Sequence, residues 1–168
     1  MGVSDALVAG AVILRPAWGN FEATITGMVE QLVSCGRLPS RLAEQAVRGI
    51  CEREAMTSTA MVDIGVSIPH ARLQGVDGLV AALALSPQAV YQAGDGLPIG
   101  IVAVVLSSPA LTGEHLTFLS ALSLLLQSAH TRSRLRNAAT IDDVLQLIRS
   151  EEQPRGFAAR RSSAPLQK

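Results

Sequence analysis

Two apolar stretches constrain the fold of this chain more than any other feature. The first runs from Leu79 to Leu85 and the second from Ile99 to Leu106, and Gly, Asp, Ser and Pro residues flank both. Short apolar runs between turn signals are typical of strands that are covered on both faces of a sheet. Helices must then lie on both sides of that sheet, so the sequence predicts an α/β fold.

The remaining segments supply those helices and two further strands. Apolar residues recur at helical spacing after Asn20, Ser40, Thr112 and Thr140, and each of these polar side chains is a candidate helix N-cap. We therefore expect helices over about 21–35, 41–55, 113–127, 131–137 and 141–150. Strands are expected at 11–14 and 66–68, with Pro69 ending the second, and 56–63 is expected to be a loop. The predicted architecture is a three-layer-like sandwich with a mixed central β-sheet flanked by helices, one domain over 1–150 and a flexible tail over 151–168.

Composition narrows the function classes. Hydrophobic residues make up 48% of the chain and charged residues 17%, which is enough apolar material for a core. Fourteen basic and fourteen acidic residues balance, so we expect no nucleic-acid partner. The N-terminus lacks the basic start of a secretory signal, and Leu97–Leu106 is too short to span a bilayer. We expect a cytoplasmic protein without stable membrane insertion, in which Cys35 and Cys51 are buried, reduced thiols.

Three histidines are the first candidates for chemistry, and two of them stand in suggestive places. His70 follows Pro69, which should end the strand and present the imidazole at the edge of the sheet. His115 lies in the expected first turn of a helix, where free backbone N–H groups and the helix dipole favour an anion. Either residue alone is as easily a structural histidine. Arg53 and the hydroxyls of Ser58 and Thr59 suit phosphate oxygens, although a surface Arg–Glu pair explains Arg53 equally well.

Several other chemistries lack their usual motifs. The sequence contains no GxxxxGK[ST] or GxGxxG loop for a nucleotide, no GxSxG for a serine hydrolase and no HExxH for a metal. We therefore expect neither a metal nor a cofactor.

Several segments together resemble the enzyme IIA domain of the phosphoenolpyruvate-dependent phosphotransferase system, in its fructose/mannitol and nitrogen-regulatory (type 2) branch. They are Arg53-Glu54, Ser58-Thr59-Ala60, Gly65-Val66-Ser67-Ile68-Pro69-His70-Ala71-Arg72, Asp95-Gly96-Leu97-Pro98 and Glu114-His115-Leu116. The resemblance covers about Ser4 to Ser150. It implies that His70 accepts a phosphoryl group from the histidine-containing phosphocarrier protein and passes it to an enzyme IIB. It also implies that His115 and Arg53 belong to the active site, which Ser58 and Thr59 would line.

The resemblance leads to a mechanism with open details. A neutral nitrogen of His70 attacks the phosphorus, while the other ring nitrogen keeps its proton and donates a hydrogen bond to an acceptor. A backbone carbonyl, Asp63 or a side chain on the facing helix would serve as that acceptor. Partners are expected to dock on an apolar rim, for which the candidates are Met61, Ile64, Val66 and Leu73.

Three functional hypotheses remain open from the sequence. The first is a relay in sugar uptake with an enzyme IIB as acceptor. The second is a nitrogen-type regulator, whose phosphorylation state controls partner proteins by binding. The third is a domain of this fold that has lost phosphotransfer and serves as a binding module. The segment Ala60–Ile64 keeps this hypothesis open, because the family that the chain resembles usually has a short Gly-rich stretch there.

Overall fold

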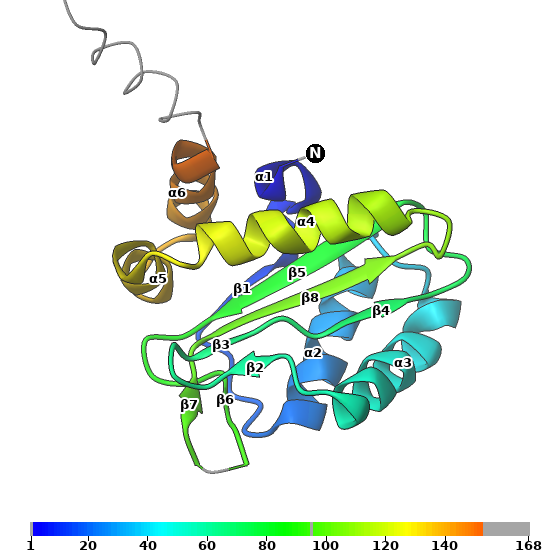
Figure 1. The fold of residues 1–168 in the computed structure, drawn as a ribbon, viewed down its shortest axis with the longest axis horizontal. Helices are drawn as coiled ribbons and strands as arrows, with labels where there is room; N and C mark the ends of the chain where they lie inside the picture. Colours follow the sequence, from blue (N-terminus) through cyan, green and yellow to red (C-terminus); the bar gives the residue numbers. More distant parts are fainter. Residues whose placement is uncertain (1, 95, 153–168) are drawn as a thin grey trace, which may run out of the picture.

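The computed structural model describes residues 2–94 and 96–152, which fold around one central sheet (Figure 1). The predicted flexible tail lies outside the described residues from position 153 onward. Its first two residues, Glu151 and Glu152, are instead the last turn of a helix. That helix therefore extends beyond the boundary expected at position 150.

Within the described residues the central sheet has six strands and is mixed, as predicted. Along its main path the strand order is β1-β5-β8-β3-β2, and β4 also pairs with β8. β5 and β8 run antiparallel, whereas β1 is parallel to β5, and both β3 and β4 are parallel to β8. The strands are β1 (Val12–Leu14), β2 (Ala60–Met61), β3 (Val66–Ser67), β4 (His70–Arg72), β5 (Leu79–Leu85) and β8 (Ile101–Ser107). A separate two-stranded sheet pairs β6 (Tyr91–Gln92) with β7 (Pro98–Ile99).

Helices cover both faces of the sheet, so the predicted three-layer arrangement is confirmed (Figure 1). One layer consists of α2 (Phe21–Ser34) and α3 (Ala43–Met56). The other contains α1 (Val3–Ala6), α4 (Thr112–Leu125), α5 (Ala129–Arg136) and α6 (Ile141–Glu152). Two 3₁₀ turns, η1 (Ala9–Ala11) and η2 (Ser40–Leu42), precede β1 and α3.

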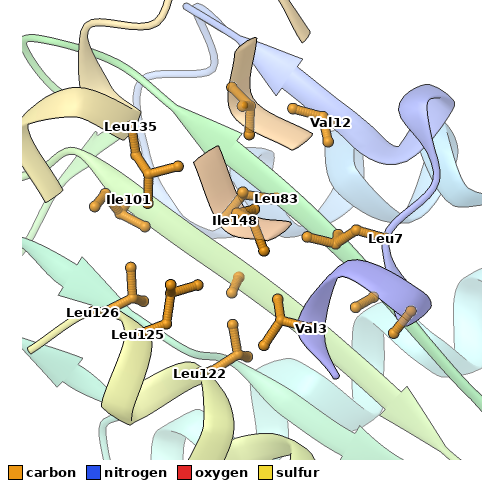
Figure 2. Close-up of a cluster of buried hydrophobic side chains, with 14 of the residues drawn as sticks. Val3, Leu7, Val12, Leu83, Ile101, Leu122, Leu125, Leu126, Leu135 and Ile148 are labelled. Atoms are coloured by element: carbon orange, nitrogen blue, oxygen red, sulfur yellow. The ribbon is translucent and has the colours of Figure 1, made fainter. Parts of the chain in front are cut away.

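The two long strands account for the two cores. Every residue of β5 and β8 is buried, and alternate side chains point to opposite faces of the sheet. Leu83 and Ile101 face α1, α4, α5 and α6, in the cluster that Figure 2 displays, whereas Ala82 and Val102 face α2 and α3. The apolar run at Leu79–Leu85 is therefore a strand buried on both sides, and so is the second run from Ile101 onward, whereas Ile99 belongs to β7.

Several local expectations are wrong. The strand β3 does end before Pro69, but a further strand that was not expected, β4, begins at the next residue and pairs with β8. The expected loop at 56–63 contains β2, which pairs with β3. Ser40 and Thr112 are not N-caps: Ser40 opens a 3₁₀ turn, and Thr112 is already the first residue of α4. Asn20 and Thr140 do cap as predicted, accepting hydrogen bonds from the backbone N–H groups of Ala23 and Asp143.

Candidate functional site

His70 is the first residue of β4, a short strand on the edge of β8. Its ring nitrogen Nδ1 lies 2.9 Å from the carbonyl oxygen of Ile68. A carbonyl can only accept a hydrogen bond, so Nδ1 carries the proton and Nε2 holds the free lone pair. Of the acceptors considered from the sequence, the backbone carbonyl is the one that the structure places here. The imidazole itself is half-buried.

His115 lies beside His70, in the first turn of α4. The two ring centroids are 5.4 Å apart and the ring planes are inclined by 60°. His115 is only 3% exposed, and its Nδ1 lies 2.5 Å from the hydroxyl oxygen of Ser107 at the end of β8. Burial lowers the pKa of His115 below its usual 6.5, and the nearby His70 and Arg72 lower it further. His115 is therefore neutral at pH 7.

An open pocket of about 530 Å³ borders both histidines, and residues of α3, of the edge strand β4 and of α4 line it. Arg53, in the last turn of α3, lines it and donates from Nη1 to the carbonyl of Thr57 at 3.4 Å. The structure thus brings together three of the predicted site residues, His70, His115 and Arg53. The pocket is lined by Gly49, Glu52, Arg53, Met56, His70, Ala71, Arg72, His115, Leu116 and Leu119.

Ser58 and Thr59 are not among the residues that line this pocket. Their hydroxyls donate to the carboxylate of Glu54, at 3.1 Å from Ser58 and 2.7 Å from Thr59, and the backbone N–H of Thr59 donates to it as well. In this arrangement the two residues close the turn after α3. Their predicted contact with a phosphoryl group would require these hydrogen bonds to be exchanged.

The apolar rim also differs from the expectation. Val66 is fully buried, Met61 and Ile64 pack against the core on the α4 side, and Leu73 packs against the core on the α3 side. Asp63 lines a different pocket, together with residues of α5. The apolar side chains at the histidine pocket are Leu119, Met56, which is 82% exposed, and Leu116, which is 56% exposed.

Two polar residues at the site, Ser107 and Arg72, were not predicted from the sequence. Ser107 is the last residue of β8, and a hydroxyl at the end of an apolar strand was the available signal. Arg72 stands within the Ile-Pro-His-Ala-Arg segment, two residues after His70. The strand period of two places the side chains of His70 and Arg72 on one face of β4.

Across the described part of the chain, no three His, Cys, Asp or Glu side chains are grouped so that they could hold a metal ion. No helix in residues 2–94 or 96–152 is long and apolar enough to cross a membrane.

Comparison with known proteins gives a consistent set of relatives. Residues 7–151 match the family model described as phosphoenolpyruvate-dependent sugar phosphotransferase system, EIIA 2. The chain is 34% identical over 131 residues to the nitrogen regulatory protein of Pseudomonas aeruginosa, which covers 77% of this chain and 84% of that protein. It is 32% identical over 128 residues to the fructose-specific EIIA component of Haloferax volcanii, which covers 74% of this chain and 81% of that protein.

A solved structure agrees at the level of the fold. The crystal structure of nitrogen regulatory protein IIA-Ntr from Neisseria meningitidis superimposes with a TM-score of 0.74 at 23% identity. The match covers 87% of this chain and 98% of that structure.

Proposed function

This chain belongs to the EIIA type 2 family of the phosphoenolpyruvate-dependent sugar phosphotransferase system, and we propose that His70 is the residue that carries its phosphoryl group. As a member of this family it is a phosphotransferase component. The single observation that carries the assignment is the hydrogen bond from His70 Nδ1 to the Ile68 carbonyl. That bond fixes one tautomer and leaves Nε2 as the nucleophile at the pocket.

The transfer moves one phosphoryl group between two imidazoles. Nε2 of neutral His70 forms a bond to phosphorus as the nitrogen–phosphorus bond of the donor phosphohistidine breaks, and the donor nitrogen keeps that electron pair. The proton on Nδ1 of His70 stays in place and remains hydrogen-bonded to the carbonyl oxygen of Ile68. No metal or nucleotide is needed, because the donor is already a phosphohistidine and the protein supplies positioning and charge stabilisation.

His115 and Arg53 have distinct roles in this proposal. Neutral His115 receives a hydrogen bond from the Ser107 hydroxyl at Nδ1 and offers its Nε2–H to a phosphoryl oxygen. Arg53 supplies a full positive charge from the rim of the same pocket. Ser58 and Thr59 remain weaker candidates for phosphate contacts, because Glu54 engages both hydroxyls.

The proposed donor is the histidine-containing phosphocarrier protein and the proposed acceptor is an enzyme IIB, which places the chain in the cytoplasm as a relay in sugar uptake. The similarity to a fructose-specific EIIA component supports this role. The similarity to a nitrogen regulatory protein supports a second candidate, in which the phosphorylation state of His70 controls a regulated partner protein by binding. Both candidates require the same first step.

Intact mass spectrometry tests that step. Wild-type chain is incubated with phosphoenolpyruvate, enzyme I and the phosphocarrier protein, in parallel with His70→Ala and His130→Ala. His130 is a matched control, because it is an exposed histidine on α5 and does not line the pocket. We expect one acid-labile phosphoryl group on wild type and on His130→Ala, and none on His70→Ala.

Unmodified wild-type chain, in the presence of donor proteins that phosphorylate a known enzyme IIA, would rule out the relay and leave the binding module. Once phosphorylation is established, mixing the phosphorylated chain with an enzyme IIB separates the two roles. Loss of the phosphoryl group to the enzyme IIB supports sugar uptake. Retention of the group, together with phosphorylation-dependent binding of another protein, supports regulation.

A further inference from the structure

Arg72 occupies a position at the site that the functional assignment does not use. It is the last residue of β4, and its side chain shares a strand face with His70 while Ala71 packs on the other side against the core formed with α3. Residues two apart on a strand are separated by about 6.6 Å. A guanidinium on a flexible stem spans that distance easily, and Arg72 lines the pocket that holds His70, His115 and Arg53.

A hydrogen bond fixes the guanidinium to the facing helix. Arg72 Nη1 donates to the hydroxyl oxygen of Thr112, the first residue of α4, at 2.8 Å. The Thr112 hydroxyl lies in turn 3.5 Å from the carbonyl of Pro109. Among the described residues, the side chain of Arg72 makes this hydrogen bond and no other, so most of its five N–H donors remain available. The side chain therefore bridges β4 and the start of α4 with donors to spare.

The phosphoryl group needs positive charge that the histidines do not provide. His115 stays neutral, so it offers a hydrogen bond rather than a cation. Glu52 lines the same pocket and its carboxylate repels a phosphate dianion. The positive charge of Arg72 is felt inside the site, since it is the third cause, after burial and His70, of the lowered pKa of His115.

We propose that Arg72 is a second phosphate-binding arginine, held by Thr112 so that its free N–H groups contact the phosphoryl oxygens during transfer to and from His70. This inference rests on the proposed function and adds a residue to it. Arg53 on α3 and Arg72 on β4 then approach the phosphoryl group from two different elements. Two guanidinium groups neutralise the transferring phosphoryl group while the nitrogen–phosphorus bonds exchange.

Rapid-quench kinetics of phosphoryl transfer tests the assignment. The full chain is mixed with increasing concentrations of phosphorylated phosphocarrier protein, as wild type, Arg72→Gln, Arg72→Lys and Thr112→Val. Arg149→Gln is the matched control, because Arg149 is exposed on α6 and does not line the pocket. Thermal unfolding of each variant reports whether it is folded.

We expect Arg72→Gln to lower the saturating transfer rate about tenfold, less than the hundredfold or more typical of a donor in a water-excluded site, because Arg72 is exposed. The donor concentration at half-saturation should stay within about twofold of wild type, since the lost contact is to the phosphoryl group. Arg72→Lys should retain part of the rate, because a lysine keeps the charge and loses the planar fork. Thr112→Val keeps the arginine, and should lower the rate by a smaller factor than Arg72→Gln.

The assignment is overturned if Arg72→Gln matches Arg149→Gln in saturating rate. It is also overturned if only the half-saturation concentration rises, because Arg72 would then contact the surface of the donor protein. If Thr112→Val transfers the phosphoryl group at the wild-type rate, the hydrogen bond from Arg72 to Thr112 is not needed for transfer, and that part of the proposal is wrong. If Arg72→Gln does not fold, Arg72→Lys and Thr112→Val decide between the same outcomes. Failure of the wild-type chain to accept any phosphoryl group would instead refute the proposed function as a whole.

Discussion

At the scale of single residues, the two imidazoles of the site differ in what holds their Nδ1 atoms. His70 faces the carbonyl of Ile68, which can only accept a hydrogen bond, so its tautomer is fixed by the backbone. His115 faces the hydroxyl of Ser107, which can donate, so its Nδ1 can act as an acceptor. Two chemically identical side chains are thereby suited to be a nucleophile and a hydrogen-bond donor.

The buried state of His115 predicts how stability depends on pH. Its pKa in the folded protein is lower than the 6.5 of the unfolded chain, chiefly because of burial. Below pH 6.5 the unfolded chain therefore binds a proton that the folded protein binds less readily. The contribution of His115 to stability is fully present above pH 6.5, and is lost as the pH falls from 6.5 towards the lower folded pKa.

Urea unfolding between pH 5 and pH 8 measures this contribution. The free energy of unfolding of wild type should fall as the pH drops below 6.5, and His115→Gln should show a shallower fall. His130→Gln removes an exposed histidine and should keep the wild-type slope. If the slope of His115→Gln equals that of wild type, the titration of His115 is not the cause.

At the scale of elements, the sequence predicted the strands and helices whose own side chains determine them. β5 and β8 follow directly from their apolar residues, and Asn20 and Thr140 cap helices as their position suggested. Elements that depend on distant partners were missed. β4 was hidden by Pro69, although the pairing of its three residues comes from β8, more than 30 positions later.

The α4 face illustrates a second kind of error. The helical spacing of the leucines at 116, 119, 122 and 126 suggests one shared inward face, but Leu116 is 56% exposed, and His115 and Phe118 are buried instead. This helix is apolar around most of its circumference, so periodicity alone could not select the inward face. The error matters for function, because the inward face carries His115 and the outward one presents Leu116 at the pocket.

Two helical glycines give a prediction at this scale. Alanine favours a helix interior over glycine by about 1 kcal/mol, so both Gly49→Ala in α3 and Gly27→Ala in α2 gain the same propensity. A Cβ at Gly49 meets the Cβ of Ala71 at an ordinary 3.6 Å. A Cβ at Gly27 overlaps the ring of Trp18, which must move.

We expect Gly49→Ala to raise the free energy of unfolding by about 0.5–1 kcal/mol, and Gly27→Ala to lower it. Urea unfolding measures both. The fluorescence of Trp18, the single tryptophan of the chain, should shift in Gly27→Ala and stay unchanged in Gly49→Ala. Equal stabilisation by the two substitutions, with no change in fluorescence, would contradict this reading of the Trp18 contact.

At the scale of the whole molecule, the site is assembled from segments that the sequence keeps apart. Arg53 comes from the end of α3, His70 and Arg72 from β4, Ser107 from the end of β8 and His115 from α4. A resemblance of motifs pointed to His70, His115 and Arg53, and the structure brings them to one pocket. Their roles in transfer stay predictions. Ser107 was missed because its role depends on which residue of α4 faces it, which is a property of the packed structure.

α1 and α6, the first and last described elements, also come from distant parts of the sequence and contact each other. α1 has only four residues, and its sequence gave no signal for a helix. Its N-terminal N–H groups, at Val3 and Ser4, donate to the carboxylate of Glu152 at the end of α6, and the Ser4 hydroxyl donates to it at 2.6 Å. An acceptor nearly 150 residues away thus satisfies groups that a short helix leaves unpaired.

This contact predicts a local change in stability. Glu152→Ala removes the acceptor, which should lower the free energy of unfolding by about 1–2 kcal/mol, as for the loss of a helix cap. Because Val3 of α1 and Leu7, the residue after it, pack into the core formed with α4 and α6, loosening α1 exposes the edge of that core (Figure 2). Hydrogen exchange should therefore accelerate at the amides of residues 3–7 before it accelerates in β5 or β8.

Glu44→Ala is the matched control, since the Glu44 side chain is 90% exposed and pairs with Arg48 at 3.8 Å on the surface of α3. It should leave both the unfolding transition and the exchange of residues 3–7 close to wild type. Unchanged exchange at these amides in Glu152→Ala would mean that apolar packing alone holds α1. Faster exchange confined to them would show that the carboxylate at the end of α6 holds α1 in place, while the sheet and the histidine pocket stay intact.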